Sequence, residues 1–398
     1  MKFIVFVLIF ISNVYAKSEI PSLIPPAKNI FMNLDVKECD RACLIDLLEQ
    51  GKIFSFLSVY KNHSQFDDIQ NEYDKYSSIF QTNEAGNIKI KLAMLVPQKV
   101  IRRYAISTVN STLAYLLYKK YNFDLKIYNS GDESETSLLN SLSEIKDDGY
   151  KYVLAPLTEN GAKIVAQNAN NLVVYIPTVN KNVIDNPNAN IIFGGIDYNN
   201  QVQKLLAYAT NKVAIFSDNS SIANELNSDI QNSAQRIVYM KQFKNSKVNF
   251  KKILKWNKRL DNSSIFLNLP LVKASLLASQ LRVYDRAPYN LLSTQINYNP
   301  MILTLTQYKD RQALLIANSI GKVNDEITAS NTLLDSDIEY NWVNYSTSLG
   351  ADLLYNSYFL RGGSRSFTEE VSNGQIKYKT YIVSPKRYSI EALTDEGM

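Results

Sequence analysis

Short apolar segments alternate with amphipathic segments along most of this chain, and this alternation restricts the folds that it can adopt. The segments IKIKLAMLVP (88–97) and NIIFGGID (190–197), for example, have the apolar, β-branched character of buried strands. Short buried strands separated by helices indicate right-handed βαβ units, with parallel sheets covered by helices on both faces. Strands of this kind are expected within 88–97, 123–131, 150–156, 172–181, 190–197, 213–219, 235–243 and 263–270, with helices within 100–120, 134–147, 159–170, 198–210, 220–233, 249–260 and 271–284.

A polar interruption, GGIDYNNQ (194–201), divides this series of units into two halves. A single open sheet with so many strands would be unusually wide, so the simpler prediction is an α/β fold with two doubly wound parallel-sheet lobes joined by a hinge. Near the end of the chain, Asn373-Gly374 predicts a hairpin with a type I′ turn. The two lobes are assigned to residues 88–196 and 197–300, with residues 301–398 returning to both lobes and ending in the hairpin.

The N-terminal residues, MKFIVFVLIFISNVYA, combine Lys2, a short apolar run and a V-x-A ending. This pattern predicts a signal peptide over residues 1–16, cleaved after Ala16, and a periplasmic mature chain. An uncleaved anchor is the alternative, although the apolar run is too short to span a bilayer as a helix. No later segment is apolar enough for a membrane span, and residues 17–34 are expected to form a tether.

A small helical module is predicted over residues 35–82, followed by a linker at 82–87. Asp35 and Glu38 have the spacing of a capping box at the start of its first helix. Cys39 and Cys43 are four residues apart, a spacing that places both on one face of a helix at a separation that a disulfide tolerates. A disulfide is therefore expected in an oxidising compartment, and two buried thiols are the alternative.

The residues available for chemistry argue against an enzyme. His63 is the sole histidine, and it lies in the helical module, outside the two lobes. No glycine-rich phosphate-binding motif is present, and GGSRS (362–366) lacks the second glycine of a nucleophile elbow. The formal net charge of +5 comes from scattered basic residues, so nucleic-acid binding is not expected. We expect no catalytic residues, no metal and no cofactor.

Polar side chains follow the predicted strands at the points where they end. Ligands of open α/β sheets bind outside the carboxyl ends of the strands, where helix N-termini offer free N–H groups. The same residue types are also preferred helix N-caps, so capping is the alternative role for each of them. The candidate ligand-binding residues are Gln98, Asn129, Ser130, Thr158, Glu159, Thr178 and Asn180 in the first lobe, Asp197 and Tyr198 at the crossing, and Asp218, Asn219 and Asn268 in the second lobe.

The segment FGGIDYNNQVQKLLAYATNKVAIFSDNSSIANEL resembles the middle of type I periplasmic binding proteins, the branched-chain amino acid receptor group. In that family a strand leads into a D-x-x-Q helix, which Asp197 and Gln201 match, and the next strand ends in an acidic-polar pair, which Asp218-Asn219 match. The resemblance covers about residues 88–385 and implies a periplasmic solute-binding fold. Further matching segments are VLAPLTENGAKIVAQNANNLVVYIP, KVNFKKIL, SSIFLNLPLVKASLLASQLRVYD and STSLGADLLY.

Two departures from that family matter for function. PQKVIRR (97–103) stands where the family has a loop of small residues that supplies a serine to the ligand, and SSI (220–222) replaces a Tyr-Gly pair. The same fold occurs in activators of peptidoglycan synthases, which bind a protein partner and carry a longer helical module before the lobes. Two hypotheses follow: capture of a small polar ligand, such as an amino acid or a peptide, by closure of the lobes, or docking of a cell-envelope protein.

Overall fold

The computed structural model describes residues 39–60, 69–70, 72–73, 75–76, 90–120, 123–185, 187–244, 248–359 and 365–393. The chain divides into two compact units, Met1–Ile88 and Lys89–Met398, and each is described by itself. The predicted signal peptide, the tether, the Asp35–Glu38 capping box, His63, the 82–87 linker and most of GGSRS lie outside the described residues. None of the helices in the described part of the chain is long and apolar enough to cross a membrane.

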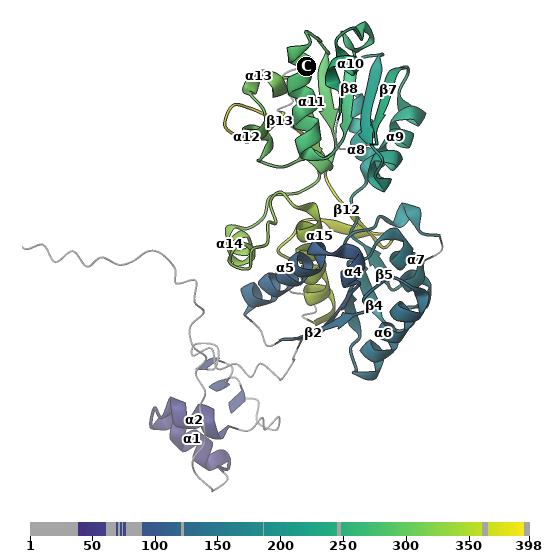
Figure 1. Ribbon diagram of the computed structural model, residues 1–398. Helices are drawn as coiled ribbons and strands as arrows, with labels where there is room; N and C mark the ends of the chain where they lie inside the picture. The colour runs from purple at the N-terminus through teal and green to yellow at the C-terminus, as the bar shows by residue number, and fades with distance from the viewer. Residues whose placement is uncertain are drawn as a thin grey trace, which may run out of the picture. The chain divides into compact units, whose positions relative to one another are not determined.

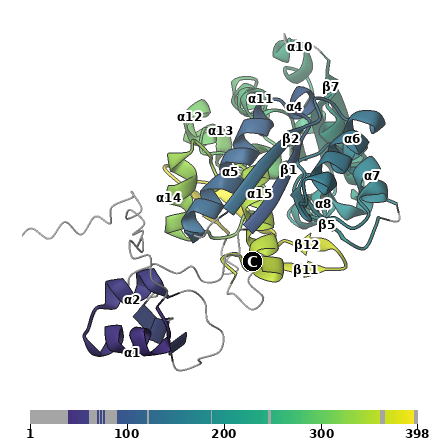
Figure 2. The same ribbon diagram turned by 90° about the horizontal axis from the view of Figure 1, so that it is seen from below.

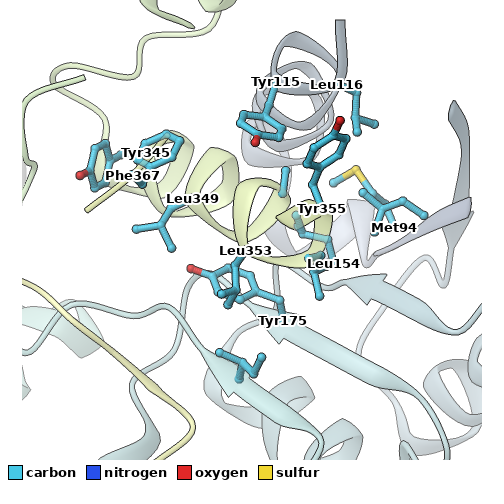
Figure 3. Close-up of a cluster of buried hydrophobic side chains, with 14 of the residues drawn as sticks. Met94, Tyr115, Leu116, Leu154, Tyr175, Tyr345, Leu349, Leu353, Tyr355 and Phe367 are labelled. Carbon is cyan, nitrogen blue, oxygen red and sulfur yellow. The ribbon is translucent and has the colours of Figure 1, made fainter. Parts of the chain in front are cut away.

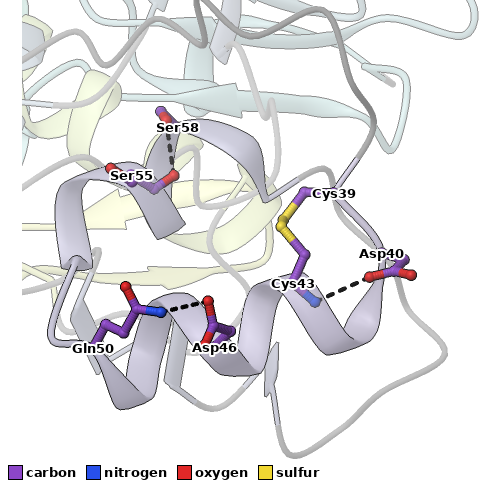
Figure 4. The surroundings of a disulfide bond; sticks show 7 residues. All are labelled: Cys39, Asp40, Cys43, Asp46, Gln50, Ser55 and Ser58. Carbon is purple, nitrogen blue, oxygen red and sulfur yellow. Dashed lines mark hydrogen bonds between the residues drawn. A yellow bond between two sulfur atoms is a disulfide. The ribbon is translucent and has the colours of Figure 1, made fainter.

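The first unit contains the helices α1 (Arg41–Glu49) and α2 (Ile53–Val59). Cys39 and Cys43 form a disulfide with a Cα–Cα distance of 5.4 Å (Figure 4). The expectation that both cysteines lie on the helix was wrong, because the helix starts after Cys39. Asp40 is the N-cap, and its carboxylate accepts a hydrogen bond from the Cys43 amide at 3.0 Å. The two helices bury an apolar cluster that includes Leu44, Phe56, Leu57, Tyr60 and Ile69.

The second unit contains two seven-stranded sheets, which confirms the prediction of two α/β lobes (Figure 1). The first sheet has the order β11-β12-β5-β4-β3-β1-β2, with β1 (Ile90–Val96), β2 (Phe123–Asn129), β3 (Tyr152–Leu154), β4 (Val173–Ile176), β5 (Ile191–Phe193), β11 (Glu370–Ser372) and β12 (Gln375–Lys377). The second has the order β14-β13-β10-β9-β8-β6-β7, with β6 (Val213–Asp218), β7 (Ile237–Phe243), β8 (Ser264–Asn268), β9 (Asn290–Ser293), β10 (Leu314–Asn318), β13 (Tyr381–Pro385) and β14 (Ile390–Ala392). We call these sheets and their helices the first and the second lobe.

Most neighbouring strands are parallel, and the C-terminal strands supply the antiparallel pairs. The turn between β11 and β12 contains Asn373 and Gly374, both with positive φ (52° and 72°), as a type I′ turn requires. The chain passes between the two sheets in the segments 194–197, 319–324 and 378–380. The described part of the hinge therefore lies at the carboxyl ends of β5 and β10 and next to the start of β13.

Helices cover both faces of each sheet. In the first lobe they are α4 (Gln98–Ile101), α5 (Arg103–Lys119), α6 (Glu135–Asp147), α7 (Glu159–Asn168), η1 (Lys181–Val183), α14 (Asp325–Leu333), α15 (Trp342–Leu354) and η4 (Tyr355–Phe359). In the second lobe they are α8 (Tyr198–Leu206), α9 (Ser221–Ser233), α10 (Phe250–Leu254), η2 (Lys258–Leu260), α11 (Leu271–Val283), η3 (Gln295–Asn297), α12 (Ile302–Leu305) and α13 (Tyr308–Arg311). Figures 1 and 2 show α6 and α7 on one face of the first sheet and α5 with α15 on the other.

Two predicted helices are interrupted. The helix expected over 100–120 is divided at Arg102, whose φ of 50° lies outside the helical region. The helix expected over 249–260 ends at Leu254 and resumes as the short η2. Phe250 and Leu254 are one turn apart and both buried, but a continuous helix would turn Leu260 away from that face. The break allows Leu260 to be buried as well.

The core of the first lobe forms around α15, which is buried from Val343 to Leu354. Figure 3 shows Leu349 and Leu353 of this helix near Tyr175. Gly350 allows the close approach, because a Cβ at that position would lie 2.2 Å from Cδ1 of Tyr175. This packing supports the sheet edge where the predicted ligand residues lie.

Candidate functional site

The structure brings Gln98 and Asn129 together at the carboxyl ends of β1 and β2. The Asn129 amide nitrogen donates to Oε1 of Gln98 at 2.8 Å, and its Oδ1 accepts from the backbone amides of Gly131 at 2.9 Å and Gln98 at 3.4 Å. Ser130 donates to the carbonyl of Asp132 at 2.9 Å. The side chains of Gln98 and Asn129 are thus hydrogen-bonded to one another, and Asn129 is also bonded to its own loop.

A carboxylate of the chain itself occupies the N-terminus of α7. Glu133, in the loop after β2, accepts hydrogen bonds from the backbone amides of Thr158 at 2.7 Å and Gly161 at 3.2 Å, and from the Thr158 hydroxyl. Gly161 leaves the space for it, since a Cβ there would lie 2.7 Å from Cδ of Glu133. The free N–H groups of a helix N-terminus favour an anion, so Glu133 fills an anion position of the first lobe. Sequence reasoning missed Glu133, and only the glycine in the first turn of α7 was a signal for it.

The remaining first-lobe candidates also contact their own chain. The Thr178 hydroxyl accepts from the Leu157 amide at 3.1 Å and donates to the Leu157 carbonyl, which joins β3 to β4. Asn180 caps η1 through the Asn182 amide at 3.0 Å and donates to the carbonyl of Gly195 at 3.2 Å. These bonds stabilise the carboxyl edge of the sheet.

Acidic side chains of the two lobes act on one another near the start of α8, where α8 packs against α9. Asp197 is the N-cap of α8 and accepts from the Asn200 amide at 2.9 Å. Desolvation, followed by the negative charges of Asp229, Glu159 and Asp197, raises the pKa of Glu225 on α9, although its side chain is exposed. Burial and Asp197 raise the pKa of Asp229, although a hydrogen bond from Asn199 opposes this shift. Glu159 pairs with Lys163 at 2.5 Å, but both side chains are about half exposed, so the pair stabilises the site little.

The second-lobe candidates open helices or lie in the interior. Asp218 accepts from the amide of Ser220 at 3.0 Å and from its hydroxyl at 2.6 Å, in the turn that starts α9, and Asn219 is exposed beside it. Asn268 is fully buried and donates to Asn227 at 2.9 Å. The structure therefore places Asn268 beneath the carboxyl edge rather than on its surface.

A buried polar network joins the segments that pass between the sheets. The Gln201 side chain donates to the Ser319 hydroxyl at 2.7 Å and accepts from the Gln295 amide at 2.9 Å, while Gln295 accepts from the Ser319 amide at 2.6 Å. Ser319 also bonds to the Thr380 hydroxyl at 3.0 Å. The half-buried Tyr198 packs edge-on against Trp342, with ring centroids 6.4 Å apart. Gln201 is marked in the sequence only by the family resemblance, and no local pattern marks Gln295 or Thr380.

A depression of about 480 Å³ lies between α10 and α11, lined by Val248, Asn249, Phe250, Lys251, Gln280 and Tyr284. It contains none of the candidate ligand-binding residues, and its lining holds one charged side chain. Within the described residues, no group of His, Cys, Asp and Glu side chains has the arrangement of a metal site. The acidic groups of α7, α8 and α9 are therefore the more informative feature for a ligand.

No protein-family model and no curated protein matches the chain. Solved structures do match. One is an amino acid ABC transporter substrate-binding protein from Pseudomonas fluorescens Pf-5, with a TM-score of 0.57 and 10% identity over 77% of this chain and 95% of that one. Another is a branched chain amino acid ABC transporter periplasmic ligand-binding protein from Burkholderia xenovorans LB400, with a TM-score of 0.57 and 13% identity over the same shares of the two chains.

A third match is the branched-chain amino acid transporter substrate binding protein LivJ from Streptococcus pneumoniae in complex with isoleucine, with a TM-score of 0.51 and 13% identity over 77% of this chain and 99% of that one. At these identities the likeness concerns the fold. It confirms the resemblance to the type I periplasmic binding protein fold that the sequence motifs indicated.

Proposed function

We propose that this chain is a non-enzymatic periplasmic binding protein that closes its two lobes on a small polar ligand, of amino acid or peptide size, through a positively charged group. The observation that supports this proposal is the acidic environment of the exposed Glu225, whose pKa is raised by desolvation and by the negative charges of Asp229, Glu159 and Asp197. Carboxylates that raise the pKa of a neighbour repel one another, and a bound cation would relieve that repulsion.

Glu133 supports the same choice of ligand. It satisfies the N-terminus of α7, where a ligand carboxylate would otherwise find free amides. A ligand that enters the first lobe with a carboxylate would have to displace Glu133 or bind beside its negative charge. A ligand with an amine or guanidinium group is attracted both by Glu133 and by the carboxylates around Glu225.

The periplasmic location rests on the sequence and on the cysteines. The first residues predict a signal peptide, and the Cys39–Cys43 disulfide is of the kind that persists in oxidising compartments. Closure would use the hinge segments that carry Ser319 and Thr380, since lobe rotation requires the connections between the sheets to bend. Gln201 of α8 bonds to Ser319 beside them.

Isothermal calorimetry with a panel of small molecules tests the proposal. The panel holds agmatine, putrescine, amino acids, short peptides and dicarboxylates, so that cationic and anionic groups are separated. We expect heat of binding for cationic members and weaker binding after Glu225→Gln. Glu135→Gln is the matched control, because Glu135 is an exposed carboxylate at the start of α6. Binding confined to dicarboxylates, or no binding across the panel, would contradict the proposal.

A second function, docking of a cell-envelope protein partner, is favoured by one set of contacts. Gln98, Asn129, Thr158 and Thr178 are all hydrogen-bonded within the chain, which leaves them less available to a small ligand. The disulfide-bonded helices of the first unit offer such a partner a second surface. Cross-linking in the periplasm followed by pull-down, with the full chain and a chain lacking residues 35–82, tests this role. An unchanged set of partners would count against a part for the module.

A further inference from the structure

The parallel strands β6 to β10 of the second lobe all begin at the same end of their sheet, which we call the amino edge. Backbone hydrogen bonds connect its segments: Val213 to Arg236 at 2.9 Å, Ser264 to Lys212 at 2.9 Å and Leu291 to Ala313 at 3.0 Å. The turn after β13 joins the same edge, because β13 runs antiparallel to β10 and Arg311 donates to the carbonyls of residues 386 and 387 at 3.1 Å and 3.0 Å. Figure 1 shows α10 at this end of the sheet.

Basic side chains from distant parts of the sequence meet at the amino edge. Its acidic side chains are largely neutralised: Asp261 pairs with Arg286 at 2.7 Å, and Asp310 pairs with Arg282. Asp285 and Glu391 are exposed acids nearby, and Glu391 accepts a hydrogen bond from the Ser389 hydroxyl at 2.5 Å. Six basic residues of this edge are exposed or, for Lys386, half-buried: Lys212, Arg236, Lys258, Arg259, Lys386 and Arg387. Because they come from the starts of three strands and the turn after a fourth, no local sequence run reveals them as one surface.

Exposed aromatic side chains lie at the same edge as these basic residues. Trp256 is 83% exposed, Tyr388 is 85% exposed and Tyr289 is 61% exposed. The Lys255 ammonium lies 4.9 Å from the Trp256 ring centroid, and the Arg387 guanidinium lies 5.8 Å from that of Tyr388. Trp and Tyr, whose rings carry a polar atom, and the flexible side chains of Lys and Arg are the residue types that favour the interface between lipid headgroups and acyl chains.

We propose that the amino edge of the second lobe docks on the surface of an anionic lipid bilayer. The basic side chains bind the headgroups, and Trp256 and Tyr388 enter the interfacial layer. The proposed ligand site and the hinge use the opposite, carboxyl edge of the same sheet, so docking leaves both free. An exported chain, as residues 1–16 predict, meets such a surface directly. Nucleic acid is less suited to this edge, because the basic residues come from several separate short segments of the described chain and not from one long helix.

Sedimentation of the full chain with vesicles tests the proposal. The readout is the ratio of binding to vesicles of equal parts phosphatidylglycerol and phosphatidylcholine over binding to phosphatidylcholine alone. The apolar run near the N-terminus contributes to both measurements and cancels in the ratio. Each basic residue near an anionic surface contributes about a fivefold gain in binding. The double variant Lys258→Gln/Arg259→Gln should therefore lower the ratio roughly 25-fold, and added salt should lower it for the wild type.

The matched control removes two exposed charges from the first lobe, in Lys146→Gln/Lys151→Gln. It has the same net charge as the test variant, and its ratio should stay near that of the wild type. A second readout follows Trp256 directly: in a Trp342→Phe chain it is the remaining tryptophan, and its emission should shift to the blue on anionic vesicles. Equal losses in the two double variants, an unshifted emission, or binding to an oligonucleotide without binding to vesicles would each overturn the proposal.

Discussion

Replacing Glu133 with alanine tests how the first lobe is held together and what its ligand edge accepts. In the native chain the Glu133 carboxylate accepts from two backbone amides and the Thr158 hydroxyl at the start of α7. A hydrogen bond to a charged group contributes about 1.5–3 kcal/mol when buried, and a favourable charge near a helix N-terminus adds about 0.3–1 kcal/mol. Thr158 is exposed, so water replaces part of this stabilisation. We expect Glu133→Ala to lower the free energy of unfolding by about 2 kcal/mol.

Urea unfolding measures this change as a lower midpoint at an unchanged slope. Glu135→Ala is the control, because Glu135 is exposed two residues further along the chain. The variant should also expose the N-terminus of α7 to outside anions, so acetate should stabilise Glu133→Ala and leave the wild type unaffected. If both alanine variants lose the same stability, or if acetate stabilises neither, the role given to Glu133 is wrong.

Three further predictions concern other contacts. Glu225→Gln should raise the urea midpoint at neutral pH, because the raised pKa means that the ionised carboxylate destabilises the native state. The stability advantage of the variant should vanish as the pH falls through the native pKa towards the ordinary value of about 4.3. An advantage that persists at that pH would contradict the prediction. Gly350→Ala should cost about 1–3 kcal/mol through overlap with Tyr175, and less when combined with Tyr175→Leu in a double-mutant cycle. Replacing Cys39 and Cys43 with serine should destabilise the first unit by about 2 kcal/mol, because the unfolded chain regains the entropy that the short closed loop removes. Limited proteolysis should then cut faster within residues 39–60 and leave the digestion of the second unit unchanged.

Local patterns predicted the features that neighbouring residues determine. The alternation of buried strands with amphipathic helices indicated the two lobes, because each unit carries its own periodicity. Asp197 and the Cys39–Cys43 pair were also recognisable, since a helix cap and a four-residue spacing each depend on contacts within one turn. The helix expected over 249–260 ends at Leu254, and the buried Leu260 lies in the separate η2, which the local periodicity did not predict.

Only the tertiary structure decided which polar residues meet. Glu133 and Gly161 are 28 positions apart, yet their contact determines whether the start of α7 is open to an anion. The repulsion that raises the pKa of Glu225 comes from residues on α7, on α8 and on α9 itself, and the basic amino edge is assembled from the ends of several strands. The sequence by itself therefore determined the fold class, the disulfide and most strands and helices between residues 88 and 284, because short-range periodicity and spacing encode them. The order of the strands in each sheet determined which charged side chains lie together at the carboxyl edge and at the amino edge. Sequence patterns do not show this, because electrostatic interactions depend on distance in space and not on distance along the chain.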